Sequence, residues 1–295
     1  MQLGRIGVWS GAFAVAPAAE ARPAAREIEE LGYDTLWYPE GLGTRESFTN
    51  GGVLLGATER IRIASGIANI WGRDAVSAAN ASRVLADAYC DRFLLGLGVS
   101  HPRQVDPRGH RYRRPVARMS AYLDAMDDDP FVSPDATAEP RPPVPRVLAA
   151  LRPPMLRLAA RKALGAHTYL VPVEHTRRAR ELLGPGPLLV VEQKVILAGD
   201  DDARARAQAA IAWYLDTPNY VDNLRWLGFS DADFEGGGSD ALVDALIVAG
   251  DEEAIRARVQ EHLDAGATQV ALQALEAGDP FGLDSLRRLA PVLLA

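Results

Sequence analysis

The fold of this chain is indicated by one short run, Phe93-Leu94-Leu95-Gly96-Leu97, which is apolar at every position. A strand with one face in water alternates apolar and polar residues, whereas a continuous apolar run is typical of a strand covered on both faces. Such strands belong mostly to parallel sheets, in which crossover helices cover both faces. The run therefore predicts an α/β protein with a parallel sheet.

Similar runs recur along the chain with helical patterns between them, and together they predict eight strands. These are Arg5–Trp9, Thr35–Tyr38, Ile61–Ile67, Arg92–Leu97, Arg146–Ala150, Thr168–Val171, Leu188–Leu197 and Gln269–Ala274. Eight parallel strands joined by helices predict a single domain, a closed (β/α)8 TIM barrel, because ring closure leaves no exposed sheet edge. The alternative is an open doubly wound sheet. Against it, no GxGxxG loop follows the first strand, where a dinucleotide-binding fold needs one.

Helix-capping residues support the helices between the strands. Asp74 is predicted to cap a helix over Ala75–Tyr89, because a carboxylate at this position accepts hydrogen bonds from free backbone N–H groups. Asp251 is predicted to cap Glu252–Ala265 in the same way. The alternation of strand and helix thus continues to the end of the chain.

Two segments interrupt this alternation. The proline-rich segment Asp127–Pro145 is expected to be an extended connector before strand five. The segment Asp201–Asp244 is expected to be a helical insertion after strand seven, with helices over Ala203–Leu215 and Pro218–Leu227. This insertion is expected to form either a wall of the substrate pocket or a dimer surface.

The composition excludes several classes of protein. The chain has 295 residues, with 39 acidic and 32 basic side chains and a net charge of −7, so bulk binding of nucleic acid is not expected. Charges interrupt every apolar stretch, so no membrane span is expected, and the N-terminus lacks a signal-peptide pattern. The one cysteine, Cys90, cannot form an intramolecular disulfide. We therefore expect a cytoplasmic protein that acts on a small-molecule substrate.

The reactive groups of a (β/α)8 barrel lie at the carboxyl ends of its strands. Glu40 directly follows a predicted strand and is expected at the barrel mouth, as an acid, a base or a cap of the next loop. His101 follows strand four, and an imidazole there exchanges a proton near neutral pH. His175 lies shortly after strand six and is a candidate either for contacting a phosphate or for the first turn of a helix.

An arginine-rich loop follows strand four. It contains Arg103, Arg108, Arg111, Arg113, Arg114 and Arg118. These side chains either receive a phosphate or carboxylate tail at the mouth or pair with acidic helices elsewhere. The sequence motifs of several other enzyme classes are absent. The chain has no CxxC, HExxH, P-loop or GxSxG motif, so neither a metal site nor a hydrolase triad is predicted.

Three segments resemble the bacterial luciferase-like superfamily. They are GYDTLWYPE at residues 32–40, IASGIAN at residues 63–69 followed by Arg73, and DRFLLGLGV at residues 91–99. The most similar subgroup is that of the oxidoreductases of actinobacteria that depend on the deazaflavin coenzyme F420. The resemblance implies a barrel that binds F420 across its mouth and transfers a hydride between the coenzyme and a small organic substrate. It also implies a homodimer.

The resemblance further implies a cofactor site built from strand ends. A bulge with a non-prolyl cis peptide would fall at Gly66-Ile67 behind the flat ring, with Asn69 beside it. Glu40 and His101 match positions that flank the reacting ring carbon. The other residues that would line the cofactor are Ser10, Gly98, Val99, Ser100 and Ala150.

One segment departs from the family pattern. Relatives often place small residues after the Ala-Ala of strand five, where backbone N–H groups bind the cofactor phosphate, whereas this chain has Leu151-Arg152-Pro153-Pro154. Proline has no N–H to donate. Arg152 either replaces these donors by its charge or marks an altered cofactor site.

Two alternative functions remain open. The first is an FMN-dependent monooxygenase of the same superfamily that uses reduced flavin and O2. The arginine-rich loop favours F420 over FMN, because the F420 tail carries a phosphate and several carboxylates. The second alternative is a barrel without a redox cofactor that serves in binding, which the departure at Arg152 favours. Fold-level analogy does not identify the substrate.

Overall fold

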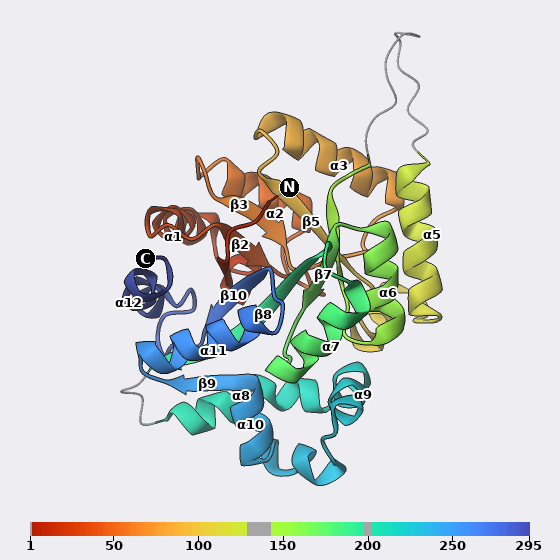
Figure 1. The fold of residues 1–295 in the computed structure, drawn as a ribbon. Coiled ribbons are helices and arrows are strands. Elements are labelled where there is room, and N and C mark those ends of the chain that lie inside the picture. Colours follow the sequence, from red (N-terminus) through yellow and green to blue (C-terminus); the bar gives the residue numbers. More distant parts are fainter. Residues whose placement is uncertain (1, 129–142, 198–201) are drawn as a thin grey trace, which may run out of the picture.

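The computed structural model describes residues 2–128, 143–197 and 202–295, and shows a central barrel of strands surrounded by helices (Figure 1). The strands are β1 (Ile6–Trp9), β2 (Thr35–Tyr38), β3 (Arg62–Ser65), β4 (Ala68–Asn69), β5 (Phe93–Gly98), β6 (Arg146–Ala149), β7 (Gly165–Thr168), β8 (Leu188–Leu197), β9 (Ile247–Gly250) and β10 (Gln269–Ala274). The α-helices are α1 (Ala18–Glu30), α2 (Ser47–Leu55), α3 (Ala75–Ala88), α4 (Pro102–Val105), α5 (Pro115–Asp127), α6 (Pro153–Lys162), α7 (Val173–Leu183), α8 (Ala203–Leu215), α9 (Pro218–Leu227), α10 (Asp240–Leu246), α11 (Glu252–Asp264) and α12 (Leu283–Leu293). Short 3-10 helices are η1 (Gly11–Ala14), η2 (Asp106–Arg108) and η3 (Asp231–Gly237).

The strands close into a parallel ring. Within the described residues the ring runs β1-β2-β3-β5-β6-β7-β8-β10, and β10 pairs with both β1 and β8 to close it. Two strands pair beside the ring, β4 with β5 and β9 with β8. The predicted (β/α)8 barrel is confirmed, and the open doubly wound sheet is excluded. No helix in the described ranges has the length and apolarity needed to cross a bilayer.

The local signals for helices are confirmed. Oδ1 of Asp74 accepts a hydrogen bond from the Ser77 N–H at 2.8 Å, and Oδ1 of Asp251 accepts one from the Ala254 N–H at 2.8 Å. The insertion after β8 contains α8 and α9 at their predicted bounds, followed by α10. These three helices lie together on one side of the barrel (Figure 1), around their own apolar cluster, which includes Ile211 and Leu246.

Several predicted boundaries are wrong. The sixth ring strand is β7, not Thr168–Val171, because the chain turns after Thr168: Leu170 has a φ of 55°. Strand three is split into β3 and β4 by a bulge at Gly66-Ile67. The short β9 was not predicted. Most of the expected connector Asp127–Pro145 lies outside the described residues.

Two glycines of β5 allow the bulge to enter the barrel. Inward-facing residues of the barrel interior include Trp37, Leu94 and Val190, and strand alternation directs Gly96 and Gly98 inward as well. A Cβ on Gly96 would lie 2.0 Å from the backbone oxygen of Ser65, and one on Gly98 would lie 2.3 Å from Cδ1 of Ile67. The bulge therefore fills the space that side chains would take on a regular strand.

We expect Gly96→Ala to destabilise the fold by about 2 to 3 kcal/mol, because the new methyl group meets backbone that cannot move aside without disturbing β3. Urea unfolding followed by circular dichroism measures this change. The control is Gly186→Ala, where no atom lies within 4 Å of the new Cβ, and it should change stability by less than about 0.5 kcal/mol. Equal stability of the two variants would contradict the close approach at Gly96.

Candidate active site

The barrel mouth has two chemically different halves. Alternation along the strands directs Gly98 and Ala149 into the mouth on one side, next to the Gly66-Ile67 bulge. On the other side it directs Glu192 and Lys194 of β8 and Gln273 of β10 inward, and Tyr169 follows β7 there. The first half presents backbone and small side chains, whereas the other half is polar and aromatic.

The bulge is fixed from three sides. The Gly66-Ile67 peptide is cis, as the family resemblance implied. The Gly66 N–H donates to the Tyr38 carbonyl at 2.7 Å, and the Glu40 N–H donates to the Ile67 carbonyl at 3.2 Å. The indole Nε1 of Trp9 donates to the Gly66 carbonyl at 3.1 Å. Gly66 and Ile67 remain half-buried, so solvent still reaches this surface.

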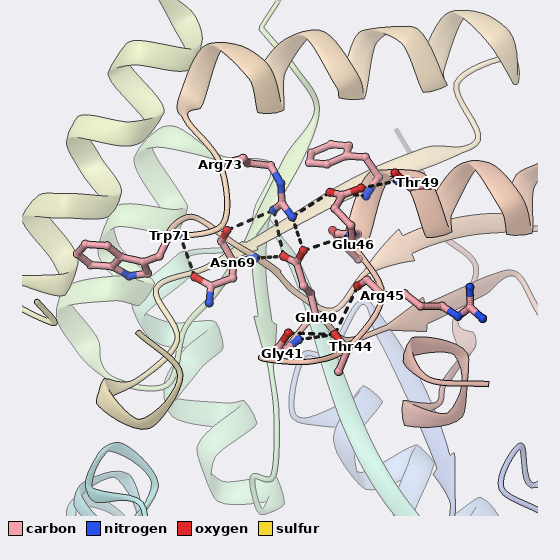
Figure 2. A network of polar contacts seen from close by, with 12 residues as sticks. Glu40, Gly41, Thr44, Arg45, Glu46, Thr49, Asn69, Trp71 and Arg73 are labelled. Carbon is pink, nitrogen blue, oxygen red and sulfur yellow. Dashed lines mark hydrogen bonds and ion pairs between the residues drawn. The ribbon is translucent and has the colours of Figure 1, made fainter. Parts of the chain in front are cut away.

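Glu40 is the centre of a buried polar network (Figure 2). Its side chain is 5% exposed and forms a two-point ion pair with Arg73, in which Nη1 lies 3.0 Å from Oε2. Oε2 also accepts a hydrogen bond from the Asn69 N–H at 2.7 Å, and Oε1 accepts one from the Ser47 N–H at 3.2 Å. Because these donors occupy the carboxylate, the geometry favours a role in holding the bulge over one in proton transfer.

His101 lies at the N-terminus of α4, with its ring packed at 5.0 Å against Trp213 of the insertion. The residue is 9% exposed, and its Nδ1 has no hydrogen-bond partner within the described residues. Burial, and secondarily the charge of Arg103, lower the pKa of His101. A neutral imidazole at this position is able to accept a proton from a bound molecule.

Unpartnered polar atoms show that the strand ends fit a polar ligand. The Nδ2 of Asn69 is buried and has no partner among the described residues, although its Oδ1 accepts a hydrogen bond from the Trp71 N–H at 3.0 Å. Buried polar groups normally have partners, so an amide donor beside the bulge is suited to an acceptor on a bound cofactor. The Nε2 of His167, inside the barrel below Gly66, is also buried and unpartnered.

The remaining predicted cofactor residues lie at strand ends but with different accessibility. Ser10 is 5% exposed, and its N–H donates to the Trp37 carbonyl at 3.0 Å. Val99 and Ser100 follow β5 and are half-buried, and the Val99 carbonyl accepts from Nε1 of Trp71 at 3.0 Å. Ala150 follows β6 and is buried, with its N–H bound to the His167 carbonyl at 3.2 Å.

The segment after β6 offers no free helix N–H for a phosphate. Pro153 and Pro154 occupy the first two positions of α6, and the Met155 N–H already donates to the Arg152 carbonyl at 3.1 Å. Arg152 itself is 48% exposed, with a loose contact of 3.5 Å to Asp222. An anion held at the start of α6 would therefore be bound by the Arg152 guanidinium rather than by the first N–H groups of the helix.

His175 lies in the first turn of α7, which is one of its two predicted placements. Its Nε2 lies 2.6 Å from the Leu151 carbonyl and therefore carries the hydrogen. Burial lowers the pKa of His175 to about 4, so the ring is neutral, and its Nδ1 is a buried acceptor with no partner in the part of the chain that the structure describes. A neutral Nδ1 does not donate to a phosphate, so the geometry favours support of the Leu151 backbone.

The arginine-rich loop borders this mouth. Arg108 donates to the Gly41 carbonyl at 3.4 Å, and Arg118 stacks on Trp71 at 5.0 Å. Arg103, Arg111, Arg113 and Arg114 are exposed. Their charges are thus available to an anionic group that extends from the mouth.

Sequence reasoning assigned no role to the residues that hold the mouth together. Trp9 supports the bulge, and Arg73 neutralises Glu40. It also missed Glu192 and Lys194, which form a buried ion pair at 3.0 Å. A signal for this pair is present in the sequence, since β8 is otherwise a long apolar strand and both charges fall on the inward-facing register.

Comparisons with known proteins identify the family of this chain. A family model described as luciferase-like monooxygenase matches residues 2–269. The chain is 25% identical over 304 residues to the 5,10-methylenetetrahydromethanopterin reductase of Methanolobus tindarius, covering 90% of this chain and 92% of the relative.

Solved structures share the fold along the whole chain. An F420-dependent secondary alcohol dehydrogenase in complex with an F420-acetone adduct superimposes with a TM-score of 0.75 at 14% identity, covering 99% of each chain. The oxygenating constituent of 3,6-diketocamphane monooxygenase from Pseudomonas putida, in complex with FMN, gives a TM-score of 0.71 at 15% identity and also covers 99% of each chain. At these identities the similarity supports the fold alone.

Proposed function

The chain belongs to the luciferase-like monooxygenase family, as the resemblance of its motifs indicated, and on this premise we propose that it is an F420-dependent oxidoreductase. It would transfer a hydride between coenzyme F420 and a small organic substrate. Relatives and structural neighbours include F420-dependent reductases or dehydrogenases and an FMN-containing monooxygenase. The homodimer and the cytoplasmic location expected from the sequence stay predictions.

One observation carries the proposal: the small-residue half of the mouth. There the Gly66-Ile67 bulge, Gly98 and Ala149 form a surface of backbone and small side chains, next to the unpartnered amide of Asn69. Flat, polar-edged cofactors need close backbone approach and a few placed donors. A purely structural barrel has no use for a buried amide without a partner.

The side chains of this half would act by binding and orienting the ring. Trp9 and Glu40 hold the bulge behind it, and Asn69 offers a donor to its polar edge. When bound, F420 supplies or accepts the hydride, and the protein contributes position and electrostatics. His101, neutral and covered by Trp213, would hold or release the accompanying proton at Nδ1.

Charge favours F420 over FMN. The exposed arginines of the loop before α5 lie on a chain whose net charge is −7, so they form a local attraction for anions. A tail with several carboxylates gains more from them than a single phosphate does.

We expect F420 to bind at micromolar concentration, measured by titrating the purified protein into F420 and following its fluorescence. Affinity should fall as salt is raised, because the exposed arginines contribute through screened charge. FMN titrated in parallel should bind more weakly. Tighter binding of FMN with oxygen consumption would favour the monooxygenase instead, and failure of both to bind would leave the barrel without a redox cofactor.

A further inference from the structure

The polar half of the mouth contains a buried ion pair whose position needs an explanation. Nζ of Lys194 lies 3.0 Å from Oε1 of Glu192, and the two side chains are 2% and 1% exposed. Removing both charges from water costs several kcal/mol per ion, and hydrophobic residues of similar size often serve stability equally well. The pair is therefore weak evidence for stability, and its contacts point to another role.

Both charges act on the same short corner, Tyr169-Leu170. Nζ of Lys194 lies 3.9 Å from the centroid of the Tyr169 ring, a close cation–π contact. Oε2 of Glu192 accepts a hydrogen bond from the Leu170 N–H at 3.0 Å. Leu170 has a φ of 55°, which side-chain-bearing residues rarely adopt and which persists only where neighbours enforce it. The pair thus fixes one tyrosine ring at the mouth.

Tyr169 is the middle of a chain of hydrogen bonds. The Tyr214 hydroxyl of α8 donates to the Tyr169 hydroxyl at 2.9 Å, which donates to Oε1 of Gln273 at 3.1 Å. Tyr169 and Gln273, the middle and last residues of this hydrogen-bond series, are half-buried and therefore partly accessible to solvent at the mouth. The Tyr220 ring packs on Tyr214 at 4.8 Å, and its hydroxyl forms no hydrogen bond within the described residues.

The electrostatics of this cluster favour a neutral ligand. Glu192 and Lys194 offset each other, and burial lowers the pKa of Lys194 while the carboxylate opposes that shift. Burial raises the pKa of Tyr214 to about 12 and holds that of Tyr169 well above its usual range, so both phenols are uncharged. Aromatic walls with one or two hydrogen-bonding groups are typical of sites for small organic molecules with few polar atoms.

We propose that the Gln273 amide, whose oxygen accepts the hydrogen of the Tyr169 hydroxyl, binds the carbonyl or hydroxyl oxygen of a neutral organic molecule through its Nε2, and that Tyr169, with Glu192 and Lys194 behind it, is a positioning residue for this amide. If the chain is the oxidoreductase proposed above, this organic molecule is its substrate. The subsite faces the small-residue half of the mouth, so a ligand held there by its oxygen lies between the two halves. This assigns carbonyl compounds and alcohols, rather than acids, as the substrate class.

The test measures the affinity of the full-length protein for cyclohexanone by saturation-transfer NMR, first without cofactor and then with F420. Tyr169→Phe should weaken binding about 10-fold, because it keeps the ring but removes the hydrogen bond that orients the Gln273 amide. Tyr220→Phe is the matched control in the same cluster and should change the affinity less than about 2-fold. Cyclohexanecarboxylate should bind more weakly than cyclohexanone to the wild type.

The positioning role has its own readout. Lys194→Met should weaken cyclohexanone binding, and the double variant with Tyr169→Phe should bind no more weakly than Tyr169→Phe alone, because both changes act through one hydroxyl. If Lys194→Met alone unfolds the protein, the double variant Glu192→Gln with Lys194→Met replaces it, because this variant removes both buried charges. We expect the double variant to show the loss of cyclohexanone affinity stated for Lys194→Met.

These measurements test the proposed subsite independently of F420 binding. No cyclohexanone binding to the wild type, equal effects of the two Tyr→Phe variants, or preference for the carboxylate would overturn the subsite. F420 affinity is measured on the same samples and should be unchanged by Tyr169→Phe. Binding of cyclohexanone that depends on Tyr169, without any F420 binding, would support the subsite and remove only the proposed function.

Discussion

Lowering the pH from 7 to 5 should remove roughly 5 to 6 kcal/mol of the free energy of unfolding, because three buried histidines stay neutral in the folded protein. Burial lowers the pKa of His167 and of His175 to about 4 and that of His262 to about 3. In the unfolded chain these groups titrate near 6.5, so below that pH the unfolded state binds protons that the folded state excludes. The full free energy of unfolding is therefore present above pH 6.5, and the part linked to these three histidines is lost as the pH falls toward their folded pKa values.

His262 shows why the folded state excludes the proton. It is fully buried, and its Nε2 lies 2.9 Å from Oε1 of Gln193. The amide of Gln193 donates to the Lys194 and Leu246 carbonyls, which makes its oxygen the acceptor for His262. Nδ1 of His262 then accepts from the Thr176 hydroxyl at 2.8 Å. A proton on Nδ1 would have to displace that hydroxyl, with Arg258 adding repulsion.

Urea unfolding at several pH values between 7 and 5 measures this loss. Each histidine should contribute about 1.4 kcal/mol per pH unit in the steep part of this window, so His262→Gln should flatten the slope by about one third. Carboxylates with a lowered pKa, such as Glu46 and Asp74, lose their contribution as the pH falls from the usual carboxyl pKa toward the lower folded pKa, so most of that loss lies below this window. A slope that His262→Gln leaves unchanged would show that the histidine is protonated in the folded state.

Sequence signals predicted a helix or strand correctly where neighbouring residues in the sequence determine it. α8 and α9 match their predicted bounds because helical periodicity is a local property, and Asp74 and Asp251 cap helices because their partners lie three residues away. β7 was misplaced because its position depends on a neighbour. A Cβ on Gly165 would lie 1.9 Å from the Leu188 carbonyl, a constraint that sequence alone does not contain.

The candidate site was predicted only in outline for the same reason. The position of Glu40 follows from the end of its strand, but its partner Arg73 lies 33 residues further along the chain. The contact of His101 with Trp213 depends on where the insertion folds back over the mouth, and that of Tyr169 with Lys194 depends on the pairing of β7 with β8. The family resemblance supplied the bulge at Gly66-Ile67, whose position no periodicity marks.

Arg73→Met should destabilise the protein by about 3 to 5 kcal/mol, because it leaves the Glu40 carboxylate buried without its counter-charge. Arg73 also donates to the Asn69 carbonyl at 3.2 Å and lies 2.9 Å from Glu46, so the loop after the bulge loses a second anchor. Urea unfolding at pH 7 measures the loss. Combining it with Glu40→Gln removes both charges and should recover part of the stability, whereas additive losses would contradict a mutual ion pair.

Glu40→Gln alone separates the two roles assigned to this residue. If Glu40 holds the bulge, the amide keeps the shape but loses the charge that binds Arg73 and the Asn69 N–H, so F420 affinity and stability should fall together. If Glu40 instead moves a proton, F420 affinity should be retained while turnover falls and the pH dependence of turnover loses one limb. The side chain already accepts hydrogen bonds from four groups of the protein, two guanidinium nitrogens and two backbone N–H groups. A carboxylate engaged in this way has few lone pairs free for a substrate, and we therefore expect the first result.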